Sequence, residues 1–221
     1  MKKLVIIVFV FLSQLTNAQV TRNLGDFDQV KVFDKINVKL ISGSENKIII
    51  TGNRADEVET VNKNGELKIR MPFPKLLSGD AITVKLYYKI IESISVSEGS
   101  YVSSEDTFKQ TSIDLNAKAG SEINIDLDVE KVNVKANSGG IIELSGKAIN
   151  QDVAITSGGI LKASGLHTSQ TSISVAAGGK AEIYATTLVD AKVKAGGSIY
   201  IHGKPKQINK EVFIGGTIIE K

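Results

Sequence analysis

One sequence pattern recurs seven times, with its turns between residues 99 and 215. It consists of two apolar residues spaced i and i+2, a small glycine-rich turn, and two more apolar residues spaced i and i+2. The turns follow one another at intervals of 18 to 21 residues and begin at Gly99, Gly120, Gly139, Gly158, Gly178, Gly196 and Gly215. A fixed period this short is typical of solenoid proteins, in which each repeat packs only against its neighbours. The period therefore constrains the fold strongly and the chemistry hardly at all.

Apolar and polar residues alternate on both sides of each turn. Around Gly139, for example, Val134 and Ala136 precede the turn and Ile142 and Leu144 follow it. A period of two predicts strands with one inward face, and it excludes a helical solenoid, whose apolar residues fall at i, i+3 and i+4. Like segments recur without a hairpin signal between them, so they stack in parallel. We predict an all-β fold, a right-handed parallel β-helix of about seven coils of 18–21 residues.

Each coil contains further signals after the turn. Glycine suits the turn because it adopts positive φ readily, and a second corner is predicted seven residues later, at Gly146, Gly165 and Gly203. A looser stretch then predicts a third wall and a triangular coil. This wall carries one large apolar residue per coil, namely Phe108, Val129, Ile149, Leu188 or Ile208.

Residues 19–92 lack the regular turns, but the alternation of apolar residues continues there. Asn64-Gly65 between two alternating segments is a strong hairpin signal. The segment Met71-Pro72-Phe73-Pro74 interrupts any strand and predicts a loop that runs to Gly79. We interpret residues 19–92 as irregular coils and a cap that form one domain with the regular coils of residues 93–221. A separate small β domain is the alternative.

The first 18 residues have the pattern of a secretory signal peptide. Lys2 and Lys3 precede an unbroken apolar run from Leu4 to Leu12, and the small residues of Thr16-Asn17-Ala18 precede Gln19. Nine apolar residues are too few to span a bilayer. We therefore predict that residues 1–18 are removed, that the mature chain begins at Gln19, and that the protein is exported to the periplasm or the cell surface.

The composition limits the kinds of partner that the mature chain is expected to bind. The sequence contains no cysteine, so neither a disulfide nor a lipid-modified cysteine is expected. Without Lys2 and Lys3, the 27 basic residues become 25 against 24 acidic ones. A balanced charge does not favour nucleic acid or anionic lipid. No second apolar stretch is long enough to span a membrane, so a soluble mature protein is expected.

The last coil has no polar residues after it to cover its end. The sequence closes with Phe213-Ile214-Gly215-Gly216-Thr217-Ile218-Ile219 and two charged residues. An uncovered strand edge favours pairing with another chain. We therefore expect a homo-oligomer formed through this open coil, which sedimentation measurements at several concentrations would detect.

Several segments together resemble one known family. They are the opening Arg22–Val30, the Asn64–Ile69 hairpin, the glycine-spaced coils and the closing His202–Lys206. The sequence resembles the head GIN domain of the putative autotransporter adhesins, exported proteins of Bacteroidetes-type bacteria, over essentially the whole mature chain. The literal Gly-Ile-Asn tripeptide is missing, and no autotransporter barrel follows. The resemblance implies a β-helix and adhesion, and it supplies no site residues.

Catalytic and metal-binding patterns are weak. His167 and His202 are the only histidines, and no thiol accompanies them, so no metal site is expected. Asp126 and Asp128 share one strand face, and paired carboxylates can serve as acid and as nucleophile or base. They support the alternative of a carbohydrate-active lyase or hydrolase. We assign no catalytic, cofactor-binding or metal-binding residue.

Two tyrosines are the candidate binding residues. Tyr184 and Tyr200 are predicted to point outward from neighbouring coils, and tyrosine combines a large contact area with a polar tip. The alternative is that they cover the ends of the apolar core. The outward fourth position after each turn predicts charge pairs between coils; it reads Asn124, Glu143, Lys162, Glu182 and Tyr200.

These observations predict an exported, non-enzymatic protein of the cell envelope. Its role is recognition, adhesion or scaffolding, and its partner is an unknown protein or glycan that contacts a broad surface of the β-helix. The carbohydrate-active enzyme is the second hypothesis. A structural spacer in the envelope is the third.

Overall fold

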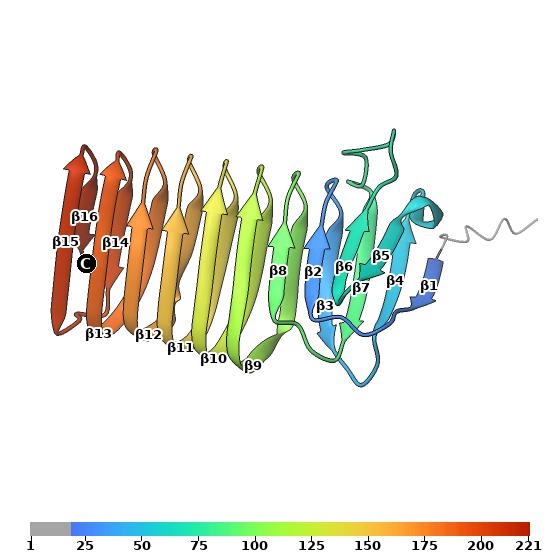
Figure 1. Ribbon diagram of the computed structural model, residues 1–221, viewed down its shortest axis with the longest axis horizontal. Coiled ribbons are helices and arrows are strands. Elements are labelled where there is room, and N and C mark those ends of the chain that lie inside the picture. Colours follow the sequence, from blue (N-terminus) through green and yellow to red (C-terminus); the bar gives the residue numbers. More distant parts are fainter. Residues whose placement is uncertain (1–18) are drawn as a thin grey trace, which may run out of the picture.

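Parallel coils stack along one axis in the computed structural model, which describes residues 19–221 (Figure 1). The predicted signal peptide, residues 1–18, lies outside the described residues. Each of the five longest strands pairs in parallel with the next one along the chain. These strands are β9 (Tyr101–Lys118), β10 (Glu122–Asn137), β11 (Ile141–Ile155), β12 (Ile160–Val175) and β13 (Lys180–Ala195). The prediction of an all-β right-handed parallel β-helix is confirmed.

Each coil consists of one long strand with a bend that divides it into two walls. In β10, buried and exposed residues alternate as far as Val129, then Glu130 and Lys131 are both exposed, and alternation resumes at Val132. Two successive exposed residues change the phase of the alternation, so the chain turns here. We call this bend the elbow. The residues between a glycine turn and the elbow form the back wall, and the residues between the elbow and the next turn form the front wall (Figure 1).

The predicted third wall is not a separate strand, because β10 runs without a break from Glu122 to Asn137. Phe108 and Val129 are buried as predicted. The prediction is wrong for Ile149, which is 51% exposed. Ile149 lies at the elbow of β11, where the alternation changes phase, and Ala148 takes the inward position instead.

The two adjacent glycines of a turn, such as Gly139 and Gly140, are required for two different structural reasons. Ser138 and Gly139 both have positive φ, at 49° and 74°, so the chain reverses through two left-handed residues. Gly140 has an ordinary φ, but a Cβ atom there would lie 2.2 Å from the carbonyl oxygen of Ala117 in the preceding coil. The first glycine therefore provides the backbone conformation, and the second lets neighbouring coils approach.

The N-terminal strands continue both walls in an unexpected order. In the front wall, β2 (Gln29–Val32) lies between β6 (Glu66–Arg70) and β8 (Ser93–Val96), in parallel with both. In the back wall, β3 (Asn37–Ser42) lies between β7 (Ile82–Tyr88) and β9, again in parallel with both. The first coil of the chain is therefore inserted between two later segments. One cluster of buried apolar residues runs from Phe27 to Ile201.

Antiparallel strands and a short helical turn cover the N-terminal end (Figure 1). The hairpin predicted at Asn64-Gly65 is confirmed, since β5 pairs antiparallel with β6 around it. On the back wall, β4 pairs antiparallel with β7 and β1 pairs antiparallel with β4. The bounds are β1 (Gln19–Asn23), β4 (Lys47–Gly52), the 3-10 helix η1 (Ala55–Glu57) and β5 (Glu59–Lys63).

The predicted loop from Met71 to Gly79 is confirmed, and a buried carboxylate holds it. Asp34 is 1% exposed, and its two carboxylate oxygens accept hydrogen bonds from the backbone N–H groups of Met71 and Leu77, each at 2.9 Å. Phe73 projects from the loop with 86% of its surface exposed.

The last coil contains β14 (Ser198–His202), β15 (Gln207–Ile214) and β16 (Thr217–Glu220). The expectation that no polar group covers its end is wrong. Lys210 and Glu220 occupy positions paired with the inward-facing Ala191 and Ile201, and they form an ion pair between the two walls. Phe213 and Ile214 of β15 are 61% and 75% exposed. Association of two molecules through this end stays a prediction. Within residues 19–221, no helix is long and apolar enough to cross a membrane.

Candidate functional site: a polar trough on the front wall

Two columns of outward side chains run along the front wall, because the coils stack in register. The first, the aspartate column, is formed by the sixth residue before each glycine turn. It reads Ser93, Asp114, Asn133, Asp152, Ser172, Asp190 and Asn209. Acidic residues alternate with neutral ones from β9 onward, which avoids placing like charges on adjacent strands.

The second column, the lysine column, is formed by the residue two positions later in each strand. From β2 to β15 it reads Lys31, Ser95, Asn116, Lys135, Ala154, Ser174, Lys192 and Glu211. A lysine recurs at every third strand from β2 to β13, with two small residues between successive lysines. Because strands in a sheet lie about 4.8 Å apart, these lysines are about 14 Å apart along the axis.

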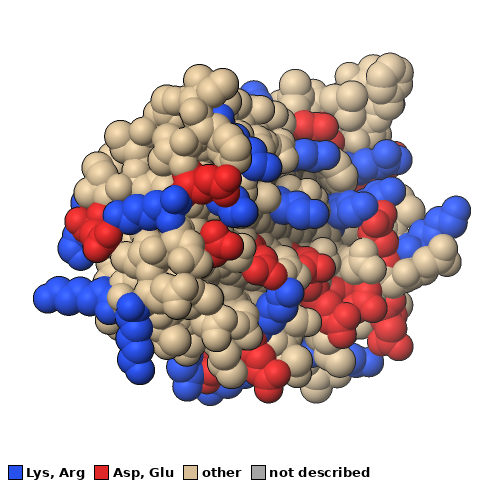
Figure 2. All heavy atoms as spheres, turned by 60° about the vertical axis from the view of Figure 1, so that its left-hand side comes forward, with Lys and Arg blue, Asp and Glu red and all other residues tan. Residues whose placement is uncertain are grey.

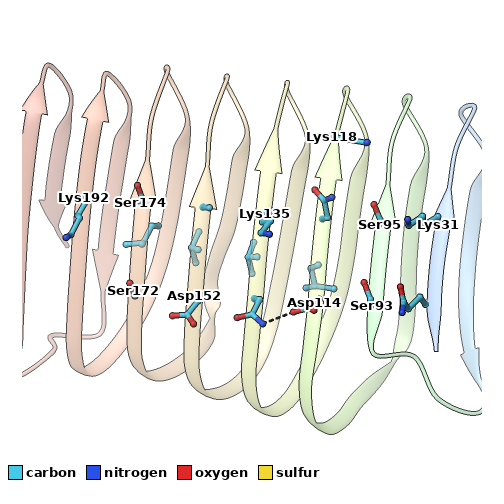
Figure 3. A pocket seen from close by; sticks show the side chains of 18 of the residues that line it. Lys31, Ser93, Ser95, Asp114, Lys118, Lys135, Asp152, Ser172, Ser174 and Lys192 are labelled. Carbon is cyan, nitrogen blue, oxygen red and sulfur yellow. Dashed lines mark hydrogen bonds between the residues drawn. The ribbon is translucent and has the colours of Figure 1, made fainter. Parts of the chain in front are cut away.

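Small side chains between the lysines leave the front wall hollow. A trough of about 850 Å³ crosses β2 and β8 to β13, and its floor includes Ser95, Ala154, Ser172 and Ser174 (Figure 3). Its seven strands span about 29 Å along the solenoid axis at about 4.8 Å per strand. Figure 2 shows basic side chains gathered along the hollow, with acidic side chains in a row beside them.

Ion pairs fix the charged side chains at the two ends of the trough. At the β2 end, Lys31 contacts Glu66 at 2.5 Å, and its hydrogen bond is the main reason why the pKa of Glu66 is lowered. At the β13 end, Lys192 contacts Glu211 at 3.3 Å. Asp152 pairs with Lys131 at 2.8 Å near the elbow, and this hydrogen bond raises the pKa of Lys131.

The middle of the trough contains charges and polar groups without such partners. Lys118 and Lys135 make no ion pair within 4.0 Å of any acidic group in the part of the chain that the structure describes. Both are exposed, and the two residues lie on the neighbouring strands β9 and β10. Asn116 lies between Lys135 and Ser95 in the lysine column, two residues before Lys118 in β9, and its side-chain oxygen is buried without a hydrogen-bond partner. The centre of the trough is thus free to accept an anionic or hydroxyl-rich ligand.

The two predicted tyrosines lie on the opposite, back wall. Both are half-buried and point outward. The ring of Tyr184 stacks on that of His167, with 4.1 Å between centroids. The ring of Tyr200 lies 5.3 Å from the ammonium of Lys180 and 4.6 Å from that of Lys221. These contacts engage part of each ring, and their role in binding stays a prediction.

The carboxylates that suggested catalysis are occupied by neighbours. Asp126 accepts hydrogen bonds from the hydroxyls of Thr107 at 2.6 Å and Ser145 at 2.9 Å. Asp128 pairs with Lys147 at 3.3 Å. Both residues thus bridge adjacent coils, as stabilising side chains do. Among residues 19–221, no group of three or more histidine, cysteine or acidic side chains could hold a metal ion.

The charge ladder predicted on the back wall is confirmed for one pair of coils; among the described residues, Lys162 and Glu182 form no ion pair with each other. Glu143 pairs with Lys162 on the next coil at 3.2 Å. Glu182 is contacted by Lys180 at 3.1 Å within its own strand, and this hydrogen bond is the main cause of its lowered pKa. A smaller hollow of about 540 Å³ lies over these residues. Its charged groups already satisfy one another, in contrast to Lys118 and Lys135 in the front-wall trough.

Sequence reasoning missed the trough, although its signal is present. Counting back six and four residues from each turn glycine lists both columns from β8 onward. However, polar residues at outward positions are also found on any strand face that only contacts solvent, so the pattern by itself does not indicate a binding site. What distinguishes this face is the recurrence of Lys31, Lys135 and Lys192 in one column with small residues between them, and β2 enters that column only through the unexpected strand order.

The comparisons with known proteins agree with this architecture. A family model described as "Putative auto-transporter adhesin, head GIN domain" matches residues 26–205. The chain belongs to this family. No curated protein matches it. The resemblance drawn from the sequence is therefore confirmed.

Solved structures from Bacteroidetes share the fold. A putative adhesin from Bacteroides fragilis superposes with a TM-score of 0.86 and 20% identity, covering 94% of this chain and 98% of its own. A putative adhesin from Parabacteroides distasonis gives a TM-score of 0.76 and 22% identity, with coverage of 92% and 96%. A putative lipid binding protein from the same species gives 0.66 and 17%, also with coverage of 92% and 96%. At these identities the likeness extends to the fold alone.

Proposed function

We propose that this head GIN domain protein is an exported, non-enzymatic binding protein of the cell envelope that holds an extended polymer in its front-wall trough. The trough is the observation that carries the proposal. It presents polar side chains in register on seven successive strands, over about 29 Å. A surface with a translational repeat suits a ligand that is itself a chain of repeating units.

The composition of the trough favours a glycan over a protein partner. Its outward lining consists mainly of serine, asparagine, aspartate and lysine side chains, and Phe33 at the β2 end is its one aromatic residue. Protein interfaces concentrate aromatic residues, methionine and arginine at their centres and deplete serine, lysine and aspartate. Hydroxyl, amide and carboxylate groups instead match the hydroxyl groups of sugars as hydrogen-bond donors and acceptors.

Three observations support a binding role at the envelope rather than catalysis. The paired carboxylates Asp126 and Asp128 are engaged by neighbouring coils. The family to which the chain belongs is described as "Putative auto-transporter adhesin, head GIN domain". The pattern of residues 1–18 predicts export. A carbohydrate-active enzyme and a structural spacer remain the competing hypotheses.

A bulky substitution on the floor of the trough tests the proposal. Ala154 is exposed and faces outward, so Ala154→Trp should fill the hollow between Lys135 and Ser174 without entering the core. Ser164→Trp is the matched control, because Ser164 is an exposed small residue of the hollow on the back wall. The mature protein and both variants are applied to an array of host and bacterial glycans, and soluble products are assayed in the same wells.

The proposal predicts saturable binding without product, lost in Ala154→Trp and retained in Ser164→Trp. Released product would establish the enzyme instead. Binding that disappears in Ser164→Trp and persists in Ala154→Trp would move the site to the back wall, near Tyr184 and Tyr200.

A further inference from the structure

We infer that the trough selects an anionic glycan, whose carboxylate or sulfate groups contact Lys118 and Lys135 while the chain lies along the solenoid axis. This inference rests on the proposed function, because it specifies which polymer the same trough binds. It adds the charge of the ligand, its direction and the two side chains that recognise it.

The charge of the lining favours an anion. Four lysines line the trough, Lys31, Lys118, Lys135 and Lys192, against the two aspartates Asp114 and Asp152. Among residues 19–221 both aspartates already have partners. Asn133 donates to Asp114 at 2.6 Å, and Lys131 pairs with Asp152. Asp114 keeps its negative charge in that hydrogen bond, so outside the ion pairs the lining has two positive charges, on Lys118 and Lys135, against one negative charge.

Those two lysines face weaker competition from carboxylates than the lysines at the trough ends. Glu98 is close enough to Lys118 for that positive charge to act against the raised pKa of its carboxyl, but no ion pair within 4.0 Å joins them. Lys31 and Lys192 at the trough ends contact Glu66 and Glu211, so a ligand would have to compete with these carboxylates. Lys118 and Lys135 have no acidic partner within 4.0 Å in the described part of the chain. A hydrogen bond between an ammonium and a carboxylate or sulfate is about twice as strong as one between neutral groups. The central pair should thus dominate affinity.

The direction of the ligand follows from the two columns. Along the axis, a chain meets a lysine, then two small residues, then a lysine again, about 14 Å later. A chain lying across the axis would also cross the aspartate column, which is two residues from the lysine column in each strand. The carboxylates of that column would repel an anion. An anionic chain is therefore favoured along the lysine column.

Three soluble polymers of different charge test the inference on the mature protein. Polygalacturonate carries carboxylates, dextran sulfate carries sulfates, and dextran is neutral. Binding is measured by biolayer interferometry at several salt concentrations. The variant Lys118→Gln with Lys135→Gln removes the central charges. The matched control is Lys109→Gln with Lys206→Gln, which removes two exposed lysines that lie outside the trough and likewise form no ion pair within residues 19–221.

We expect at least one anionic polymer to bind more tightly than dextran, with an affinity that falls as salt rises. The trough variant should weaken that binding at least about tenfold, equivalent to about 1.4 kcal/mol, since it removes two charge-assisted hydrogen bonds. The control should change it less than twofold. Preference for polygalacturonate or for dextran sulfate then identifies the anionic group.

Other outcomes overturn the inference, and they separate it from the proposed function. If dextran binds as well as the anionic polymers and Ala154→Trp abolishes all binding, the trough binds glycans without selecting charge. If both lysine pairs weaken binding equally, the attraction is general and the trough does not select. If no anionic polymer binds, the inference fails, and the glycan array then decides whether the proposed function survives.

Discussion

Neighbouring glycines of one turn should respond very differently to the same substitution. At Gly139, whose φ is 74°, an added Cβ meets nothing within 4 Å. Gly139→Ala therefore adds only the strain of an alanine in the left-handed region, about 1 kcal/mol. At Gly140, the Cβ would lie 2.2 Å from the carbonyl oxygen of Ala117 and 2.4 Å from its carbon. Relieving that contact requires adjacent coils to separate locally.

The cost at Gly140 can be estimated from what must move. Overpacking of this kind typically destabilises by about 1–3 kcal/mol. The displacement also stretches the hydrogen bond from the Ile141 N–H to the Ser121 carbonyl, 2.8 Å long and worth about 1 kcal/mol. We therefore expect Gly140→Ala to lower the free energy of unfolding by about 2–4 kcal/mol.

Thermal unfolding followed by circular dichroism compares the two variants. For a protein of this size, about 1 kcal/mol lowers Tm by roughly 2–4 °C, so the shift at Gly140 should be two to four times that at Gly139. The next turn offers an independent copy of the test, because a Cβ at Gly158 meets nothing and one at Gly159 would lie 2.3 Å from the Ala136 carbonyl oxygen. Equal shifts within a pair, or a larger one at the first glycine, would refute the reasoning.

Three further changes have defined expected outcomes. Asp34→Ala leaves the backbone N–H groups of Met71 and Leu77 without their acceptor, so limited proteolysis should cut the loop of residues 71–79 faster than in the parent. Asp34→Asn keeps one acceptor oxygen, so its cleavage rate should lie between those of the parent and Asp34→Ala. The lowered pKa of Glu66 means that its ion pairs stabilise the fold above the unfolded-state pKa of about 4.3, and that this contribution disappears as pH falls through the lower folded-state value; urea unfolding of Glu66→Gln should therefore depend less on pH below about 4.3 than that of the parent. Replacing both Lys210 and Glu220 with leucine removes the ion pair over the last coil and should increase dimer content in sedimentation velocity, whereas an unchanged distribution would show that this pair does not limit association.

The regular coils could be predicted from the sequence because their signals are local. Positive φ at Gly139 and alternating apolar residues on both sides of it need only a few neighbours to be recognised. The elbow was harder to predict, because it depends on two successive exposed residues within a continuous strand. That is why Ile149 was expected inside and is found at the surface.

The trough could not be predicted in the same way, because it depends on which strands become neighbours. Lys31 precedes Ser95 by 64 residues, and only the parallel pairing of β2 with β8 places them in one column. Sequence alternation assigns Lys31 to an outward face and says nothing of the strand beside it. Tyr184 and Tyr200 could be selected from the sequence by residue type alone. Whether Lys118 and Lys135 form ion pairs within the described residues depends on the side chains around them, which only the structure shows.

The inserted first coil has a consequence for the order in which the molecule can fold. Each regular coil pairs with a segment 17 to 21 residues away, and so can add to its predecessor as soon as it is synthesised. By contrast, β3 must wait for β9, since Asn37 pairs with Tyr101. Closing a long segment costs more entropy than closing a short one, and non-local pairing slows folding. The earliest-synthesised coil therefore acquires both of its neighbours late, and assembly cannot simply proceed from the N-terminus coil by coil.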